Sequence, residues 1–154
     1  MMKLCSDVLT ALSGKTLVTA ESLTGGGIGA ALTAVSGSSA VYKGGIISYT
    51  NWVKENVLGV PGEVLQTHGA VSLPVAEAMA IGARRVLQAD VAVSVTGLAG
   101  PGGDDYGNPV GTVCIGFSNA QKSFAVKHHF EGSREEVRSQ TIRAALELVL
   151  DNHQ

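Results

Sequence analysis

Hydroxyl, acidic and glycine residues are concentrated between positions 21 and 27, in the order Glu21-Ser22-Leu23-Thr24-Gly25-Gly26-Gly27. The apolar run 17–20 precedes them and the small-residue run 28–32 follows, which is typical of a strand that ends just before a helix begins. Unpaired N–H groups at a helix start favour an oxyanion or a phosphate. The segment therefore predicts either a serine nucleophile, Ser22, with its oxyanion hole, or a cradle for a phosphate group.

The same glycines fit the dinucleotide-binding pattern G-x-G-x-x-A, at Gly25, Gly27 and Ala30. That pattern needs an acid about 20 residues later to hold the ribose, and no acid lies between Glu21 and Glu55. No Gly-Lys-Ser/Thr sequence follows the glycines, which excludes a P-loop. Both observations disfavour a nucleotide cofactor, and we expect no cofactor.

A serine nucleophile needs a base, and the best-placed candidate is Lys54. The histidines His68, His128 and His129 fall in a predicted turn and a predicted strand, and the chain has no local Ser-x-x-Lys pair. A lysine can deprotonate a serine once its pKa, near 10.4 in water, falls by about three, which corresponds to roughly 4 kcal/mol. Lys54 follows residues 48–51 at the end of a predicted strand, where burial would lower its pKa. The alternative is a solvated surface charge.

A second glycine-rich segment, residues 97–103, follows the apolar run 91–96. Ligands collect at the carboxyl ends of strands in parallel α/β sheets. We therefore expect the strand ends at Ser22, Tyr49 and Thr96 to meet at one pocket. The alternative for residues 97–103 is a flexible surface loop.

Two arginines lie close to the start of the predicted last helix. Arg134 falls in its first turn, and Arg138 follows one turn later on the same face. A cation at a helix start opposes the helix dipole, so the pair indicates a bound anion such as a substrate phosphate. Pairing with Glu135 or with Asp104 and Asp105 is an equal alternative.

Strand-length apolar runs alternate with helical patterns along the chain. Helices are predicted over 2–13, 25–35, 51–58, 61–67 and 72–88, and after a capping box of Ser133 and Glu136. Strands are predicted over 16–20, 46–50, 91–96, 110–118 and 122–130. We expect Val75, Met79, Val86 and Leu87 to form the apolar face of the helix at 72–88. The alternation predicts one three-layer α/β domain, residues 1–154, with a mostly parallel sheet and one antiparallel hairpin.

Bulk composition excludes several classes of function. The net charge is −2 and no basic run is present, which argues against a nucleic-acid partner. No apolar stretch approaches the ~20 residues that span a membrane, and no signal-peptide pattern is present, so we expect a soluble cytoplasmic protein. Cys5 and Cys114 are far apart, and no His/Cys spacing is typical of metal ligands. We expect two buried thiols and no metal.

Together these motifs resemble the CinA C-terminal domain family, whose enzymatic members are nicotinamide-nucleotide amidases of the PncC type. The matching segments cover almost the whole chain: residues 19–26, 37–39, 48–51, 54, 58–60, 68–72, 96–103, 109–113 and the pattern Phe130-x-Gly132-x-Arg134-x-x-Val137-Arg138. The resemblance implies an α/β/α sandwich with a mixed sheet. It also implies hydrolysis of nicotinamide mononucleotide to nicotinate mononucleotide and ammonia, in pyridine-nucleotide salvage. Larger CinA proteins have an additional N-terminal domain, so this chain resembles the stand-alone form.

The resemblance also implies a role for individual residues. Ser22 would be the nucleophile and Lys54 its general base, while Tyr49 and Thr96 would orient groups or relay protons. The substrate-binding residues would be Thr24, Gly25, Gly26, Gly97, Gly100, Gly102, Arg134 and Arg138. Leu23 stands where the family usually has Cys, which we expect to change only local packing. The partner would be a small nucleotide substrate, and the small domain is compatible with a homodimer. The alternatives are a non-catalytic nucleotide-binding module and a hydrolase of another small carboxamide.

Overall fold

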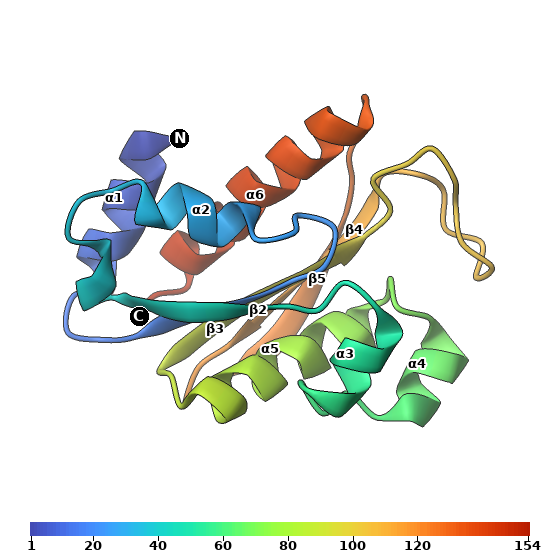
Figure 1. Cartoon of the computed structure of the whole chain (residues 1–154), viewed down its shortest axis with the longest axis horizontal. Helices are drawn as coiled ribbons and strands as arrows, with labels where there is room; N and C mark the ends of the chain where they lie inside the picture. Colours follow the sequence, from blue (N-terminus) through green and yellow to red (C-terminus); the bar gives the residue numbers. More distant parts are fainter.

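Five β-strands form one sheet between two layers of helices in the computed structural model, which describes all 154 residues (Figure 1). The strands are β1 (Leu17–Glu21), β2 (Tyr42–Ile47), β3 (Val91–Gly97), β4 (Thr112–Ser118) and β5 (Ser123–His129), and their order across the sheet is β2-β1-β3-β4-β5. The helices are α1 (Met2–Ala11), α2 (Gly27–Thr33), α3 (Asn51–Asn56), α4 (Gly62–His68), α5 (Leu73–Leu87) and α6 (Arg134–Asp151), with a short 3-10 helix at Ser38–Ala40.

Four of the five strands run in the same direction. β1 pairs in parallel with both β2 and β3, and β4 pairs antiparallel with β3 and β5, so only β4 is reversed. The β4–β5 hairpin closes through Asn119, whose side-chain oxygen accepts the N–H groups of Gln121 and Lys122, each at 2.9 Å. These pairings confirm the predicted mixed, mostly parallel sheet with one antiparallel hairpin.

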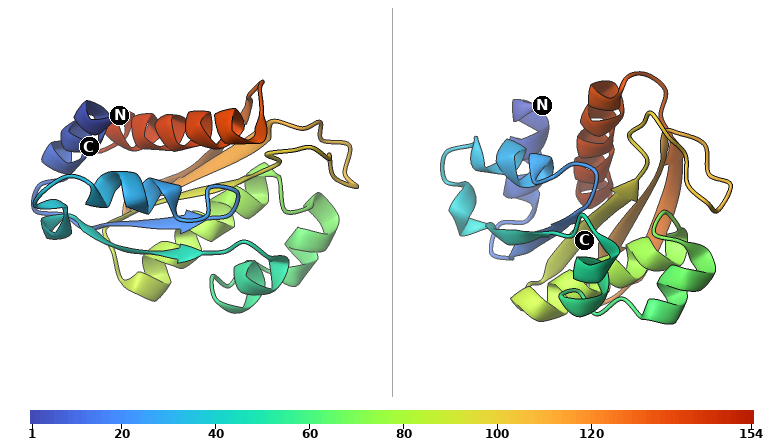
Figure 2. Two further views of the ribbon diagram at one scale, coloured as in Figure 1. Left: turned by 45° about the horizontal axis from the view of Figure 1, so that its top comes forward. Right: turned by 45° about the vertical axis from the view of Figure 1, so that its right-hand side comes forward.

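The two helix layers cover opposite faces of the sheet. Helices α1, α2 and α6 lie on one face, and α3, α4 and α5 lie on the other (Figure 2). β3 is buried on both faces, because Val93 packs into the core on the α6 side while Ala92 packs against α5. This two-sided burial is the reason why the run 91–96 has no polar–apolar alternation. The three-layer prediction is confirmed.

Two local predictions are wrong. β2 begins at Tyr42 and ends at Ile47, so it includes Gly44 and Gly45 but leaves residues 48–50 outside the strand. Gly45 pairs with Thr19 of β1 in a space too small for a side chain, and this close approach makes the glycine part of the strand. On α5, Val86 is exposed, because the buried face is made by small residues such as Ala80 and Ala83 together with Val75 and Met79.

The capping box of α6 and the two buried thiols are confirmed. The Ser133 hydroxyl accepts the N–H of Glu136 at 3.2 Å, and the Glu136 carboxylate accepts the N–H of Ser133 at 2.9 Å, which completes the capping box of α6. Cys5 and Cys114 are free and buried. None of the helices combines the length and the apolar character that crossing a bilayer would require.

Candidate active site

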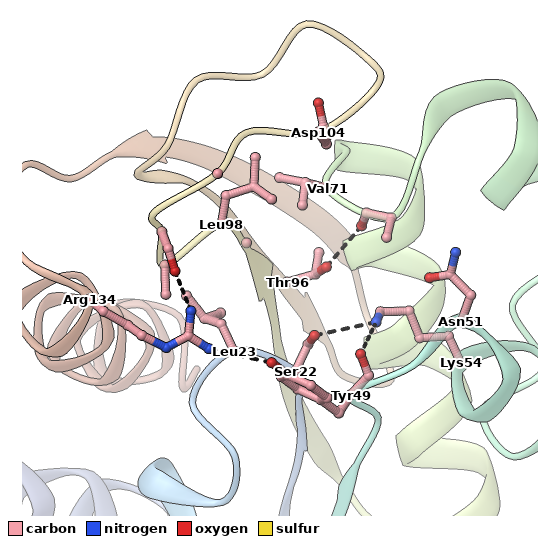
Figure 3. Close-up of a pocket in the computed structure, with 15 residues that line it drawn as sticks. Ser22, Leu23, Tyr49, Asn51, Lys54, Val71, Thr96, Leu98, Asp104 and Arg134 are labelled. Carbon is pink, nitrogen blue, oxygen red and sulfur yellow. Dashed lines mark hydrogen bonds between the residues drawn. The ribbon is translucent and has the colours of Figure 1, made fainter.

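Three parallel strands end at the same edge of the sheet, and the residues at their ends line one cavity. Ser22 follows β1, Tyr49 lies two residues beyond β2, and Thr96 is the penultimate residue of β3. Figure 3 shows the residues that line the cavity, whose volume is about 360 Å³. Its lining residues are Ser22, Leu23, Tyr49, Asn51, Lys54, Ala70, Val71, Thr96, Gly97, Leu98, Ala99, Gly100, Gly102, Asp104 and Arg134.

Lys54 is buried beside Ser22. Helix α3 starts at an N-cap formed by Thr50 and carries Lys54 inward, so that only 2% of the residue is exposed. Its Nζ donates to Ser22 Oγ at 3.3 Å, to the backbone oxygen of Ser48 at 2.9 Å and to that of Tyr49 at 3.4 Å. The alternative of a solvated surface charge is therefore wrong for this lysine.

The surroundings of Lys54 raise the fraction of its neutral form above that of a lysine in water. No carboxylate forms an ion pair with it, and burial lowers its pKa from 10.5 to about 8. In the neutral amine, the two N–H groups can bond the two backbone oxygens, which leaves the nitrogen lone pair for the Ser22 hydroxyl. The arrangement can therefore remove the proton from the serine.

The N-terminus of α2 is occupied by a side chain of the protein itself. The buried Glu21 carboxylate accepts the N–H groups of Ile28 at 2.8 Å and Gly29 at 3.0 Å, and the Thr24 hydroxyl at 2.6 Å. The N–H of Gly27 bonds the backbone oxygen of Thr24 at 2.9 Å. The helix start is thus already satisfied, and it cannot serve as the phosphate cradle that the glycines first suggested.

Three N–H groups of the turn after β1 are unpaired, those of Leu23, Thr24 and Gly26. The N–H of Gly25 bonds the backbone oxygen of Ser22 at 3.1 Å, whereas the N–H groups of Leu23 and Thr24 have no acceptor within the chain. The N–H groups of Leu23 and Thr24 follow Ser22 by one and two residues, and Leu23 lines the cavity. They are the natural donors for an oxyanion formed at Ser22. The Leu23 side chain packs into the core beside the nucleophile.

Four of the residues predicted to bind substrate do not line the cavity: Thr24, Gly25, Gly26 and Arg138. The Thr24 hydroxyl is buried against Glu21, and Gly25 and Gly26 adopt positive φ angles of 59° and 101° to form the turn. Arg138 donates from Nε to the backbone oxygen of Leu23 at 3.0 Å and from Nη2 to that of Thr24 at 3.2 Å. These residues build the turn from behind.

The other four predicted binding residues do line the cavity: Gly97, Gly100, Gly102 and Arg134. The Arg134 guanidinium donates to the backbone oxygen of Gly100 and, at 3.4 Å, to the Tyr49 hydroxyl (Figure 3). It forms no ion pair with Glu135 or with an aspartate of the loop, so its charge is available to an anion in the cavity.

Tyr49 and Thr96 border the reacting pair without bonding it. The Thr96 hydroxyl is buried and donates to the backbone oxygen of Ala70 at 2.9 Å. Tyr49 is 59% exposed, and its hydroxyl faces Arg134. Both side chains are thus placed to contact a bound molecule, and neither forms a hydrogen bond with Ser22 or Lys54 through its hydroxyl.

Several lining residues were not predicted. Ala70 and Val71 come from the segment before α5, and Asn51 comes from the first turn of α3. Nothing in their types marks them as functional. Glu21 was also given no predicted role, although an acid just before a glycine-rich helix start is a signal for a helix cap. No three His, Cys, Asp or Glu side chains gather in an arrangement that could hold a metal ion.

Comparison with known proteins places this geometry in a family. The model of the CinA C-terminal domain matches residues 1–153. A CinA-like protein of Mycolicibacterium gilvum is 46% identical over 144 residues, covering 93% of this chain and 34% of the relative. One from Parasynechococcus marenigrum is 53% identical over 133 residues, covering 85% and 32%. The chain thus spans about a third of the length of these relatives.

Solved structures are similar along almost their whole length. The competence/damage inducible protein CihA of Agrobacterium tumefaciens has a TM-score of 0.94 and 40% identity, covering 99% of this chain and 95% of that one. A competence-damaged protein (CinA) superfamily member from Enterobacter cloacae has a TM-score of 0.96 and 31% identity, covering 99% and 92%. From the family match and these similarities we conclude that the chain belongs to the CinA C-terminal domain family.

Proposed function

We propose that this chain is an amidohydrolase that converts nicotinamide mononucleotide and water to nicotinate mononucleotide and ammonia, in cytoplasmic pyridine-nucleotide salvage. The observation that carries the proposal is the buried Lys54 amine, 3.3 Å from Ser22 Oγ, with no carboxylate to keep it charged. A module that only binds nucleotides has no use for a buried base beside a serine. The geometry therefore favours catalysis over binding alone.

In the proposed reaction, the neutral Lys54 amine takes the Ser22 proton while Oγ attacks the carboxamide carbon. The carbonyl oxygen becomes an oxyanion, to which the N–H groups of Leu23 and Thr24 can donate; losing one such donor typically costs about 2.7–4 kcal/mol. The Lys54 ammonium next protonates the leaving nitrogen, ammonia departs, and an acyl ester remains on Ser22. Lys54 then takes a proton from a water molecule that attacks the ester carbon, and returns this proton to Ser22 Oγ as the C–Oγ bond breaks and the nicotinate product leaves.

The remaining cavity residues suit the nucleotide part of this substrate. A volume of about 360 Å³ lies within the range of small-molecule sites. The unpaired charge of Arg134 and the glycine backbone around Gly100 lie on the loop side of the cavity, where a ribose phosphate would extend from a carboxamide held at Ser22. Backbone groups of glycine can approach a phosphate closely because no side chain intervenes.

The proposal is tested by measuring ammonia release from nicotinamide mononucleotide, with a chelator present, for the wild type, Ser22→Ala and Lys54→Met. We expect each substitution in the pair to lower kcat by at least ~10³-fold. Lys15→Met is the matched control, because Lys15 is exposed and forms no side-chain hydrogen bond, and it should keep full activity.

Full activity of Ser22→Ala would refute the assignment of Ser22 as the nucleophile. An inactive wild type that still binds the nucleotide in calorimetry would support the non-catalytic binding module instead. Faster ammonia release from another small carboxamide in a substrate panel would show that the reaction is right and the substrate is wrong.

A further inference from the structure

A side chain far away in the sequence holds the back of the Ser22 turn. Arg138 on α6 donates from Nε to the backbone oxygen of Leu23 at 3.0 Å and from Nη2 to that of Thr24 at 3.2 Å. The carbonyl before them, that of Ser22, accepts the N–H of Gly25 at 3.1 Å. Three consecutive carbonyl groups are therefore bound. Arg138 is the only partner of the Leu23 oxygen, whereas the Thr24 oxygen also accepts the N–H of Gly27 at 2.9 Å.

Holding a carbonyl group also fixes an N–H group. In a planar trans peptide the C=O of one residue and the N–H of the next point in opposite directions. When Arg138 binds the carbonyl of Leu23, the N–H of Thr24 must point away from Arg138. The Ser22–Gly25 hydrogen bond fixes the N–H of Leu23 in the same way. The orientations of the Leu23 and Thr24 N–H groups are thus set by contacts of the carbonyl groups on the other side of each peptide.

Without Arg138, the Leu23–Thr24 peptide would have no hydrogen bond of its own. Its carbonyl accepts only from Arg138, and its N–H has no acceptor within the chain. Rotation of one peptide plane would place a carbonyl oxygen where an N–H group is needed. The planar guanidinium can bind two neighbouring oxygens at fixed spacing, which a lysine ammonium cannot do in the same way.

We propose that Arg138 is a positioning residue that holds the Leu23–Thr24 peptide in the orientation in which the N–H of Thr24 can bind the oxyanion. This inference rests on the proposed function, in which Ser22 is the nucleophile. Arg138 does not line the cavity, and both of its donor atoms that make contacts are directed at the turn. It therefore acts on the reaction through the backbone and does not touch the substrate.

The test compares Arg138→Met and Arg138→Lys with the wild type. Arg143→Met is the matched control, since Arg143 lies on the same helix, is exposed and forms no side-chain hydrogen bond. Two rates are measured: ammonia release from nicotinamide mononucleotide, resolved into kcat and KM, and covalent labelling of Ser22 by a fluorophosphonate. Labelling reports on the nucleophile and its oxyanion donors whatever the natural substrate is. Thermal unfolding shows whether each variant is folded.

We expect Arg138→Met to lower kcat and the labelling rate by on the order of 10²-fold, the loss typical of one oxyanion donor, with KM changed less than about threefold. Added guanidinium ion should restore part of the rate, and Arg138→Lys should fall between the two. A merely structural role would not separate kcat from KM or respond to guanidinium. If Arg138→Met does not fold, the Arg138→Lys variant, which keeps the charge, decides the question.

Several outcomes would overturn the inference. A raised KM with unchanged kcat would make Arg138 a substrate ligand, and unchanged rates in both assays would show that the contact has no catalytic effect. If the wild type releases no ammonia but its labelling depends on Arg138, the substrate assignment fails and the positioning role stands. If Ser22→Ala is labelled as fast as the wild type, the nucleophile is wrong and the inference falls with it.

Discussion

Raising the pH through 8 is expected to activate the protein, because it converts Lys54 from an ammonium to the amine that the reaction needs. Burial lowers the pKa of Lys54 from 10.5 to about 8. The difference of 2.5 corresponds to about 3 kcal/mol at 1.36 kcal/mol for each pKa unit. At pH 7 about one molecule in ten then carries the neutral amine, compared with about one in 3,000 for a lysine in water.

The expected profile of kcat/KM follows from these fractions. Activity should rise nearly tenfold from pH 6 to 7, reach half of its maximum at about pH 8 and level off above about pH 9. The measurement is the initial rate of formation of the carboxylate product by chromatography, with an enzyme-free blank at each pH. Lys15→Met should keep the profile. Lys54→Arg, which cannot lose its proton, should lose the activity together with its rise.

A half-maximum near pH 10 would show that burial does not tune Lys54. A flat profile between pH 6 and 9 would show that no group with this pKa limits the reaction. A rise that persists in Lys54→Arg would assign the titration to another residue. Any of these three results would refute the reasoning.

Three further predictions concern stability and the turn. Because folding lowers the pKa of Lys54, the unfolded chain binds more protons than the folded chain between pH 8 and 10.5. From pH 8 to 10, the free energy of unfolding of the wild type should therefore rise by about 2 kcal/mol more than that of Lys54→Met. Urea titrations at both pH values measure this, and the same change with pH in both proteins would contradict it. Glu21→Gln keeps the shape of the side chain but presents an NH₂ group to buried donors. It should lower the free energy of unfolding by about 1–3 kcal/mol and lower kcat. A variant as stable as the wild type would contradict the capping role. Gly82→Ala should destabilise the protein by about 1–3 kcal/mol despite the helix propensity of alanine, because the new Cβ would overlap the backbone oxygen of Leu58. Gly102→Ala is the control: the space around Gly102 is open, so this variant should keep the melting temperature of the wild type.

Much of the fold could be predicted because its signals are local. The apolar run of β3 and the capping box of α6 each depend on a few neighbouring residues, and both are present in the structure. β2 could not be placed correctly, because Gly44 and Gly45 are strand residues only through their pairing with β1. The exposure of Val86 likewise depends on which face of α5 meets the sheet.

The site shows the same division. The convergence of Ser22, Tyr49 and Thr96 follows from a general property of parallel sheets, and the structure places all three around one cavity. The position of Arg138 could not be predicted, since its hydrogen bonds reach a turn that lies 114 and 115 residues away in the sequence. The charge of Arg138 predicted that it would bind an anion, whereas in the structure it binds backbone oxygens.

The internal cap on α2 has a thermodynamic consequence for ligand recognition. A glycine-rich turn that becomes ordered only when it binds a phosphate loses conformational entropy on binding, and this loss weakens the affinity. In this protein the Glu21 carboxylate binds the N–H groups that an anionic ligand would otherwise bind, so the entropy of ordering the turn is lost once, during folding. The start of α2 is therefore ordered before the substrate arrives, and binding the substrate does not have to include the entropy cost of ordering it.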